Sequence, residues 1–322
     1  GIRSFTCDLP RVISFTSVTC HKTKEACERC SQAWWLNGRG GNRYLSYICT
    51  METAITRRKT LNHGWVYTDR IQLDIAGQSV LEFYTSRHTH SSEAAWRKRI
   101  QTGEVHLDGE RTTPDALLSA GQVLAYHRAP WQEPSVPYSF AVLHEDDHIL
   151  AVAKPSGLPV LPGGHHLENT LLSLVRNRYR DRPPPSPLHR LGRGTSGIIL
   201  FASTPLAKRS LSKDLSEGRV TKIYRTLVRG IPVSERFSIK TPIGRISHPG
   251  IGYLYAAAPE GRPSHTECRV LHRDLEKHRT LLEVHILTGR PHQIRIHLAA
   301  AGYPLVGDPL YGPGGRPIDS EP

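Results

Sequence analysis

Apolar and polar positions along the chain predict many short strands and few helices. Ile198–Phe201 is wholly apolar, which is typical of a strand buried on both faces, whereas residues 223–228 and 281–286 alternate as strands with one buried face do. Two further apolar runs, 140–143 and 149–153, are joined by an acidic turn, and this arrangement predicts a β-hairpin.

Three helices are predicted among these strands. They cover residues 169–179, with Asn169 or Thr170 as the N-cap, residues 205–215, and residues 293–301. Strands outnumber helices, and no regular strand–helix–strand rhythm appears. The pattern therefore favours an α+β fold with a mixed or antiparallel sheet.

An earlier stretch, residues 66–135, has the pattern of a small α+β module. Its polar segment 91–101 suits a helix with Trp96 and Ile100 on one face. Strands are expected on either side of the turn that ends at Gly109, one before it and one over residues 123–127.

The remaining segments complete a predicted domain organisation. Prolines 130, 134 and 137 mark a linker after the small module, and a larger domain of residues 139–322 is expected to follow. Residues 1–65 are expected to be a disordered extension, because the first 50 show no sustained helical or strand period. We expect Met51, the single methionine, to lie at or near the natural start, and the C-terminus to be truncated.

Composition adds a charge signal to this pattern. Basic residues outnumber acidic ones by 42 to 29 in 322 residues, which gives a net charge of +13 and a pI near 9.7. With 38% hydrophobic and 22% charged residues, the chain is neither disordered nor membrane-like overall. No apolar run of about 18 residues and no secretory signal pattern occurs. The positive charge favours a polyanionic partner, because neutralising phosphates releases counterions.

The cysteines are concentrated at one end of the chain. Five of the six precede Met51, and Cys268 alone follows it. Since a single cysteine forms no internal disulfide, we expect an intracellular, reducing compartment, with cytoplasm, nucleus and organelle all open. The spacing Cys27-x-x-Cys30 invites a zinc interpretation, but no second Cys or His pair follows at a finger-like distance. An unstructured extension or a translated upstream stretch is therefore preferred over a zinc site.

Three short segments in the larger domain carry the candidate chemistry. They are residues 189–197 (HRLGRGTSG), residues 222–224 (KIY), and residues 288–297 (TGRPHQIRIH), the last followed by Gly-Asp at 307–308. Backbone NH groups freed by glycines, together with several arginines, suit an anion such as phosphate. Neither a P-loop nor a dinucleotide-binding glycine pattern is present. His292 and His297 lack a nearby carboxylate or cysteine at ligand spacing, so a metal site is not expected.

In this order, the three segments resemble the RluA-type family of RNA pseudouridine synthases, in particular a plant type. The family's catalytic domain carries His-Arg-Leu-Asp-x-x-Thr-Ser-Gly, Lys-x-Tyr and Thr-Gly-Arg-x-His-Gln-Ile/Leu-Arg, and Lys154-Pro-Ser-Gly157 also matches. The resemblance covers about residues 139–312. The module before it loosely resembles a small RNA-binding module that precedes some RNA-modifying domains.

The resemblance implies a pseudouridine synthase fold and an isomerase that converts uridine to pseudouridine in RNA. The reaction is redox-neutral, so the resemblance implies neither a cofactor nor a metal. The implied partner is RNA, with rRNA or tRNA expected, and the protein is expected to be a monomer away from membranes. The target base has to leave the stack, so the protein needs a pocket that holds it.

Site residues follow from the resemblance position by position. Tyr224 matches a tyrosine that stacks on the base, and Arg290 matches an arginine that pairs with the catalytic aspartate. Arg190 matches the residue that fills the gap left by a flipped base. The other residues expected to bind RNA are His189, Arg193, Thr195, Ser196, Lys222, His292 and Arg295, together with Arg97 and Arg99 on the basic edge of the small module.

One position departs from the family. Where the family has its catalytic aspartate, this chain has Gly192, which can neither attack carbon nor accept a proton. Asp308, Asp181 and Glu283 are the candidate substitute carboxylates. Two hypotheses remain open: a pseudouridine synthase that works through a non-standard residue, and a catalytically inactive RNA-binding protein or RNA-folding helper. A metal-dependent RNA hydrolase ranks far below both.

Overall fold

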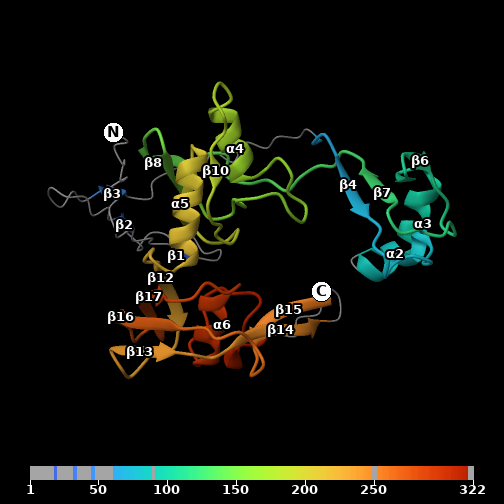
Figure 1. The fold of residues 1–322 in the computed structure, drawn as a ribbon. Coiled ribbons are helices and arrows are strands. Elements are labelled where there is room, and N and C mark those ends of the chain that lie inside the picture. Colours follow the sequence, from blue (N-terminus) through green and yellow to red (C-terminus); the bar gives the residue numbers. More distant parts are fainter. Residues whose placement is uncertain are drawn as a thin grey trace, which may run out of the picture. The chain divides into compact units, whose positions relative to one another are not determined.

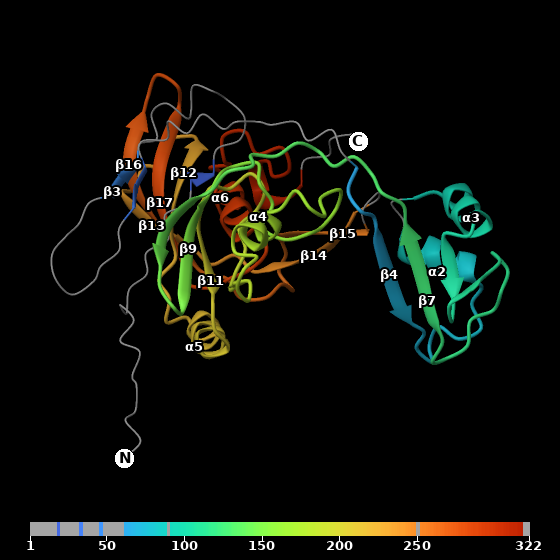
Figure 2. The same cartoon turned by 90° about the horizontal axis from the view of Figure 1, so that it is seen from above.

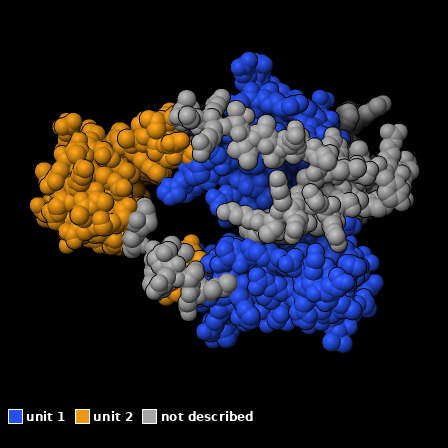
Figure 3. Space-filling model, turned by 180° about the vertical axis from the view of Figure 1, so that it is seen from behind, with its two compact units in different colours: residues 1–57, 134–246, 255–322 blue, residues 58–133, 247–254 orange. Residues whose placement is uncertain are grey.

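The computed structural model describes residues 61–88, 91–248 and 252–317, together with the backbone of three short strands. These strands are β1 (Val18–Thr19), β2 (Gln32–Trp34) and β3 (Leu45–Tyr47). The predictions of a disordered extension, and of zinc as the weaker alternative at Cys27 and Cys30, fall on residues that lie almost entirely outside this part of the chain. The chain divides into two compact units (Figures 1 and 3), the smaller comprising residues 58–133 and 247–254.

The smaller unit is a four-stranded antiparallel sheet with two helices. Its strands lie in the order β4-β7-β5-β6, and the helices precede β5 in sequence. The elements are β4 (Trp65–Arg70), α2 (Val80–Arg87), α3 (Glu93–Gln101), β5 (Val105–Leu107), β6 (Glu110–Arg111) and β7 (Val123–Arg128).

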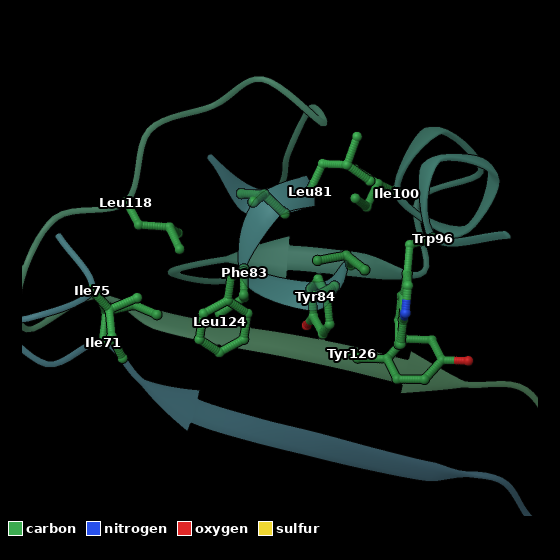
Figure 4. Close-up of a cluster of buried hydrophobic side chains, with 12 residues drawn as sticks. Ile71, Ile75, Leu81, Phe83, Tyr84, Trp96, Ile100, Leu118, Leu124 and Tyr126 are labelled. Atoms are coloured by element: carbon green, nitrogen blue, oxygen red, sulfur yellow. The ribbon is translucent and has the colours of Figure 1, made fainter. Parts of the chain in front are cut away.

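Aromatic rings make up much of the core of this unit (Figure 4). Trp96 of α3 stacks on Tyr84 of α2 with ring centroids 4.4 Å apart, and it meets the edge of Tyr126 of β7 at 5.1 Å. Ile100 lies one helical turn beyond Trp96 and is also buried, so the predicted shared face of this helix is confirmed. The rings thereby join both helices to the sheet.

Three elements of this unit are missing from the sequence prediction: α2, β4 and the two-residue strand β6. α2 has β-branched and aromatic residues on its buried side, which are more typical of strands, but a capping box between Ser79 and Glu82 fixes its start. β4 is an edge strand with largely exposed side chains, so it lacks the alternation of a half-buried strand.

The larger unit contains a four-stranded antiparallel sheet in the order β10-β11-β9-β8. Figure 2 shows β9 and β11 next to each other. α4 packs with Leu150 and Phe201 on one face, and α5 packs with Ile149 and Leu200 on the other. Both faces of the two central strands are therefore covered, which explains why β11 is apolar throughout and β9 is apolar up to Lys154. The elements are β8 (Ala141–Glu145), β9 (Ile149–Lys154), α4 (Leu171–Arg178), β10 (Ser186–Pro187), β11 (Gly197–Ala202) and α5 (Pro205–Ser216).

A second sheet of this unit has the order β1-β12-β17-β16-β13. β1 runs parallel to β12 and the other neighbours are antiparallel. Leu298 of α6 packs with Leu282 and Val284 against this sheet. The elements are β12 (Ile223–Arg229), β13 (Arg236–Ile239), β16 (Thr266–Asp274), β17 (Arg279–Ile286), α6 (Gln293–Ala300) and the 3-10 helix η1 (Pro313–Gly315). β14 (Ile243–His248) and β15 (Gly252–Ala257) form a separate two-stranded sheet.

The predicted fold class, α+β with a mixed or antiparallel sheet, is confirmed. The predicted hairpin, the apolar strand and all three helices of the larger domain are present as β8–β9, β11, α4, α5 and α6. β16 is absent from the prediction because polar Thr266 and Cys268 occupy buried positions of its alternating pattern. No helix among the described residues is long and apolar enough to cross a membrane.

Trp96→Ala tests the aromatic core of the smaller unit. We expect the free energy of unfolding of this unit to fall by about 3–5 kcal/mol, because the substitution leaves a cavity between α2, α3 and β7. Hydrogen exchange of the β7 amides in the full chain measures this change. Leu73, which is 84% exposed, provides the control, and Leu73→Ala should change the value by less than about 0.5 kcal/mol. An unaltered exchange rate in Trp96→Ala would contradict the assigned core.

Candidate active site

A cleft of about 730 Å³ lies in the larger unit. Loops and strand ends from both of its main sheets form the walls: the loop after β9, the loop between β10 and β11, the start of β12, and the turn before α6. The polar and glycine positions on these walls are Gly163, His189, Arg190, Gly192, Arg193, Lys222, Tyr224, Gly289, Arg290 and His292. The three motif segments therefore meet at one cleft.

Gly192 lies in the loop between β10 and β11, and the backbone there does not require a glycine. Its φ is not in the left-handed region, unlike that of Gly157 at 90°. A Cβ atom at position 192 would meet the Thr195 Oγ1 at 3.5 Å, an ordinary van der Waals contact. The Thr195 amide donates to the Gly192 carbonyl at 3.0 Å and closes the turn. A side chain can thus be accommodated, and the departure at 192 concerns chemistry only.

Lys154 supports this loop from beneath. It is 1% exposed, and its ammonium donates to the carbonyls of Leu158 at 2.6 Å, Pro155 at 2.9 Å and Arg193 at 3.3 Å. The amide of Gly157 donates to the same Arg193 carbonyl at 2.7 Å. The segment that begins at Lys154 therefore fixes the backbone next to Gly192. Burial lowers the pKa of Lys154 to about 7.

His189 has a comparable structural role. Its Nε2 accepts the Leu200 amide of β11 at 3.1 Å, so the neutral ring carries its proton on Nδ1. Burial, with Lys222 nearby, lowers the pKa of His189 to about 4. The ring is consequently neutral at physiological pH and aligns the loop with the strand.

Tyr224 and Lys222 enter the cleft from the start of β12. Burial raises the pKa of Tyr224 to about 12, so its hydroxyl keeps the proton at neutral pH. Burial also lowers the pKa of Lys222. Tyr224 can therefore present a neutral aromatic ring to a base, but a phenolate that removes a proton is strongly disfavoured.

Gln293 organises the turn that carries Arg290. Its Oε1 accepts the Arg290 amide at 3.0 Å and the Thr288 hydroxyl at 2.8 Å. Its Nε2 donates to the His265 carbonyl and to the Thr266 Oγ1, both at 2.9 Å. The Arg290 Nε donates only to a backbone carbonyl, that of Pro263 at 3.2 Å. The turn is rigidly anchored, whereas the guanidinium is left without a carboxylate partner among the described residues.

His292 is held at the start of α6 by a hydrogen-bond chain. The Tyr311 hydroxyl donates to the Tyr255 carbonyl at 2.7 Å, and its oxygen lies 2.8 Å from the His292 Nδ1. Because the hydroxyl proton is already used, the His292 Nδ1 is the donor and Nε2 carries the lone pair. Desolvation, together with Arg295, lowers the pKa of His292 to about 4.

Arg295 and Asp308 form an ion pair that serves the fold. Arg295 does not line the cleft; its Nε donates to the Asp308 Oδ2 at 2.7 Å and its Nη2 donates to Oδ1 at 2.5 Å. The Asp308 carboxylate also accepts the amides of Leu310 and Tyr311. Burial would raise the pKa of Asp308, but these hydrogen bonds lower it. Asp308 is therefore fully engaged and does not replace the family's aspartate.

The other two candidate carboxylates are also elsewhere. The side chain of Asp181 is 95% exposed, beside Arg180, and Glu283 accepts two bonds from Arg269 on the neighbouring strand. No residue that lines the cleft, among the described parts of the chain, is an aspartate or a glutamate. None of the three candidate carboxylates thus lines the cleft.

The remaining residues predicted to contact RNA do not line the cleft. Thr195 closes the Gly192 turn, and Ser196 follows it just before β11. Arg97 and Arg99 belong to α3 of the smaller unit. Arg97 pairs with Glu93 at 3.1 Å, and the Arg99 guanidinium lies 4.5 Å from the Trp96 ring centroid. No role was predicted from the sequence for Lys154, Gln293 or Tyr311. All three side chains are buried and anchor loops by hydrogen bonds, and this burial becomes visible only in the folded structure.

The pH dependence of stability in Lys154→Met tests whether the Lys154 ammonium group is buried in the folded protein. The folded pKa of Lys154, about 7, lies below its ordinary value of 10.5, so between these values the unfolded chain binds the extra proton. Stability should therefore rise with pH in this window, by about 1–2 kcal/mol from about pH 7 to about pH 8.5. Urea unfolding of wild type and Lys154→Met at both pH values measures this rise. We expect the variant to lack it, and an equal rise in both proteins would contradict the assignment.

Comparisons with known proteins identify the family of this chain. Residues 148–300 match the RNA pseudouridylate synthase family. An RNA pseudouridine synthase of Synechocystis is 49% identical over 242 residues, which are 74% of this chain and 81% of that protein. RNA pseudouridine synthase 5 of Arabidopsis thaliana is 44% identical over 292 residues, which are 81% and 79% of the two chains.

A bacterial relative completes the comparison. Ribosomal large subunit pseudouridine synthase D of Xanthomonas campestris is 36% identical over 226 residues, covering 66% of this chain and 65% of its own. The family match includes Gly192, Tyr224 and Arg290, so the cleft lies within the matched region. The chain belongs to the RluA-type family of RNA pseudouridine synthases, as a plant-type member.

Proposed function

We propose that this protein isomerises uridine to pseudouridine in RNA, with the target base flipped into the cleft. The observation that carries the proposal is the convergence of Tyr224, Arg290 and Arg190 on one cleft in a chain of this family. The net charge of +13 favours RNA binding through phosphate contacts.

The chemistry breaks the bond between N1 of uracil and C1′ of ribose and forms a bond between C5 and C1′. The proton leaves C5 and a proton is taken up at N1, so the overall composition is unchanged. Negative charge develops on the departing uracil, and the cations Arg290 and Lys222 are placed to stabilise it. The Tyr224 ring provides a stacking surface for the base, and the unprotonated Nε2 of His292 is an acceptor for the C5 proton.

A second candidate is RNA binding without isomerisation, in a pseudoenzyme or folding helper. The specific observation that favours it is the lack of any aspartate or glutamate among the described residues that line the cleft. Such a protein would bind RNA in a salt-dependent manner and leave uridine unchanged.

The RNA substrate, the oligomeric state and the cellular compartment of the protein are also matters of proposal. We propose rRNA or tRNA as the substrate, and the name of the bacterial ribosomal relative supports rRNA. We further propose that the protein acts as a monomer, needs neither metal nor cofactor, and resides in a reducing intracellular compartment. Among the described residues, no group of three or more His, Cys, Asp or Glu side chains could hold a metal ion.

A pseudouridine assay on a broad RNA panel separates the two functions. We expect wild type to form pseudouridine, and Gly192→Asp to raise the rate by at least about 100-fold, because it restores a nucleophilic or basic carboxylate beside Arg290. Folded wild type that binds RNA but leaves every uridine unchanged would favour the pseudoenzyme. Gly192→Ala is the matched control, since it adds a Cβ without a charge and should leave the rate near that of wild type.

Two substitutions at position 224 test the stacking role. Because the hydroxyl keeps its proton, Tyr224→Phe should retain most activity, within about tenfold of wild type. Tyr224→Ala removes the stacking surface, which is worth about 1–3 kcal/mol per base, and should lower both RNA affinity and rate. Equal losses in both variants would instead assign the role to the hydroxyl. The assay is carried out in wild type and in the Gly192→Asp background.

A further inference from the structure

Four basic side chains line the cleft without an acidic partner among the described residues. They are Arg190, Arg193, Lys222 and Arg290, and none of them takes part in an ion pair with any described residue. Elsewhere in the unit, arginines of comparable exposure are paired: Arg269 with Glu283, and Arg295 with Asp308. The cleft is therefore a local cluster of positive charge with no acidic residue among the described side chains that line it.

The side-chain space at Gly192 lies on this same wall. Apart from its two chain neighbours, a Cβ atom built there has only the Thr195 Oγ1 within 4 Å, at 3.5 Å, so the first atom of a side chain would meet no clash. Thr195 offers a hydroxyl at the edge of this space. The turn itself is fixed by the bond from the Thr195 amide to the Gly192 carbonyl and by Lys154 on Arg193. The space is therefore a preformed feature of the loop.

Size and charge together define a ligand for this space. Unpaired cations in a partly enclosed cleft repel one another, and an anion among them relieves this repulsion. Guanidinium groups bind carboxylates with two parallel hydrogen bonds, which gives geometric as well as electrostatic preference. An aspartate side chain consists of a methylene and a carboxylate, so a carboxylate of one or two carbons has the size of the side chain that Gly192 lacks.

We propose that the free protein binds a small monocarboxylate, of the size of formate or acetate, in the space beside Gly192 and within reach of Arg290. The ligand supplies the negative charge that an aspartate would otherwise provide, and RNA phosphate is its competitor at the cleft. The proposal concerns binding to the protein without RNA, so it stands or fails independently of the proposed isomerase activity.

Titration with ¹³C-labelled formate tests this site. Line broadening of the formate signal is followed at constant ionic strength, with sodium chloride as the balancing salt, on the full chain. We expect saturable broadening with wild type. Gly192→Asp should weaken binding by at least about tenfold, because its own carboxylate takes the space and the charge of Arg290. Gly192→Ala adds only a Cβ and should remain close to wild type.

Arginine variants locate the ligand. Arg290→Gln should weaken formate binding by at least about tenfold, since it removes a charge-assisted pair. Arg209→Gln, on the exposed face of α5 and outside the cleft, should leave binding unchanged. Circular dichroism confirms that each variant is folded.

Three outcomes would each overturn the proposal. They are equal formate binding by wild type and Gly192→Asp, no saturable binding by wild type, and formate binding that Arg290→Gln leaves unchanged. Phosphate is compared in the same titration. If phosphate bound wild type and Gly192→Asp equally well, and displaced formate no better than sodium chloride of equal ionic strength, the cleft would attract anions without selectivity. This result would also overturn the proposal.

Discussion

The cleft depends on two buried polar side chains that satisfy the backbone of its loops. A loop beside a substrate cannot pair all its amides and carbonyls as a helix or a sheet does, yet an unpaired buried group costs about 1–3 kcal/mol. Lys154 donates to three carbonyls around the Gly192 loop, and Gln293 accepts from and donates to four groups around the Arg290 turn. Each anchor lies in a different half of the larger unit, so the two walls of the cleft are fixed separately.

Much of the fold could be predicted because its elements bury regular faces. The wholly apolar β11 and the helices α4 to α6 follow from periodicity and caps, since α4 and α5 cover the two faces of one sheet. α2 escapes prediction because its buried residues are strand-like in type. β16 escapes because Thr266 holds a buried position for a polar reason: its hydroxyl is shared by Gln293 and His297. A polar residue that is buried because it hydrogen-bonds to a distant segment interrupts the alternation of apolar and polar positions from which a strand is predicted.

The motif residues of the site could be located from the sequence. Which of them line the cleft and which anchor its loops could not be predicted. His189 and Arg295 have the composition of phosphate ligands, yet one aligns a strand and the other neutralises Asp308. Such partners are 11 to 13 residues apart along the chain, and no spacing rule connects them. Tyr224, Arg290 and Arg190, by contrast, do line the cleft. The distinction between an anchor and a cleft residue follows from burial and hydrogen-bond partners, which only the three-dimensional structure supplies.

These anchors also decide how the glycine at position 192 should be understood. A lost carboxylate often accompanies a collapsed loop, in which case restoring the residue would restore nothing. Here the Lys154 and Thr195 contacts hold the turn, its φ is open to any residue, and the space beside it is clear. Arg290 is likewise held by its backbone amide and not by a carboxylate, so its position does not depend on the missing group. The backbone at position 192 is therefore compatible with a side chain, and the feature that sets this cleft apart is the set of four cations that line it without an acidic partner among the described residues.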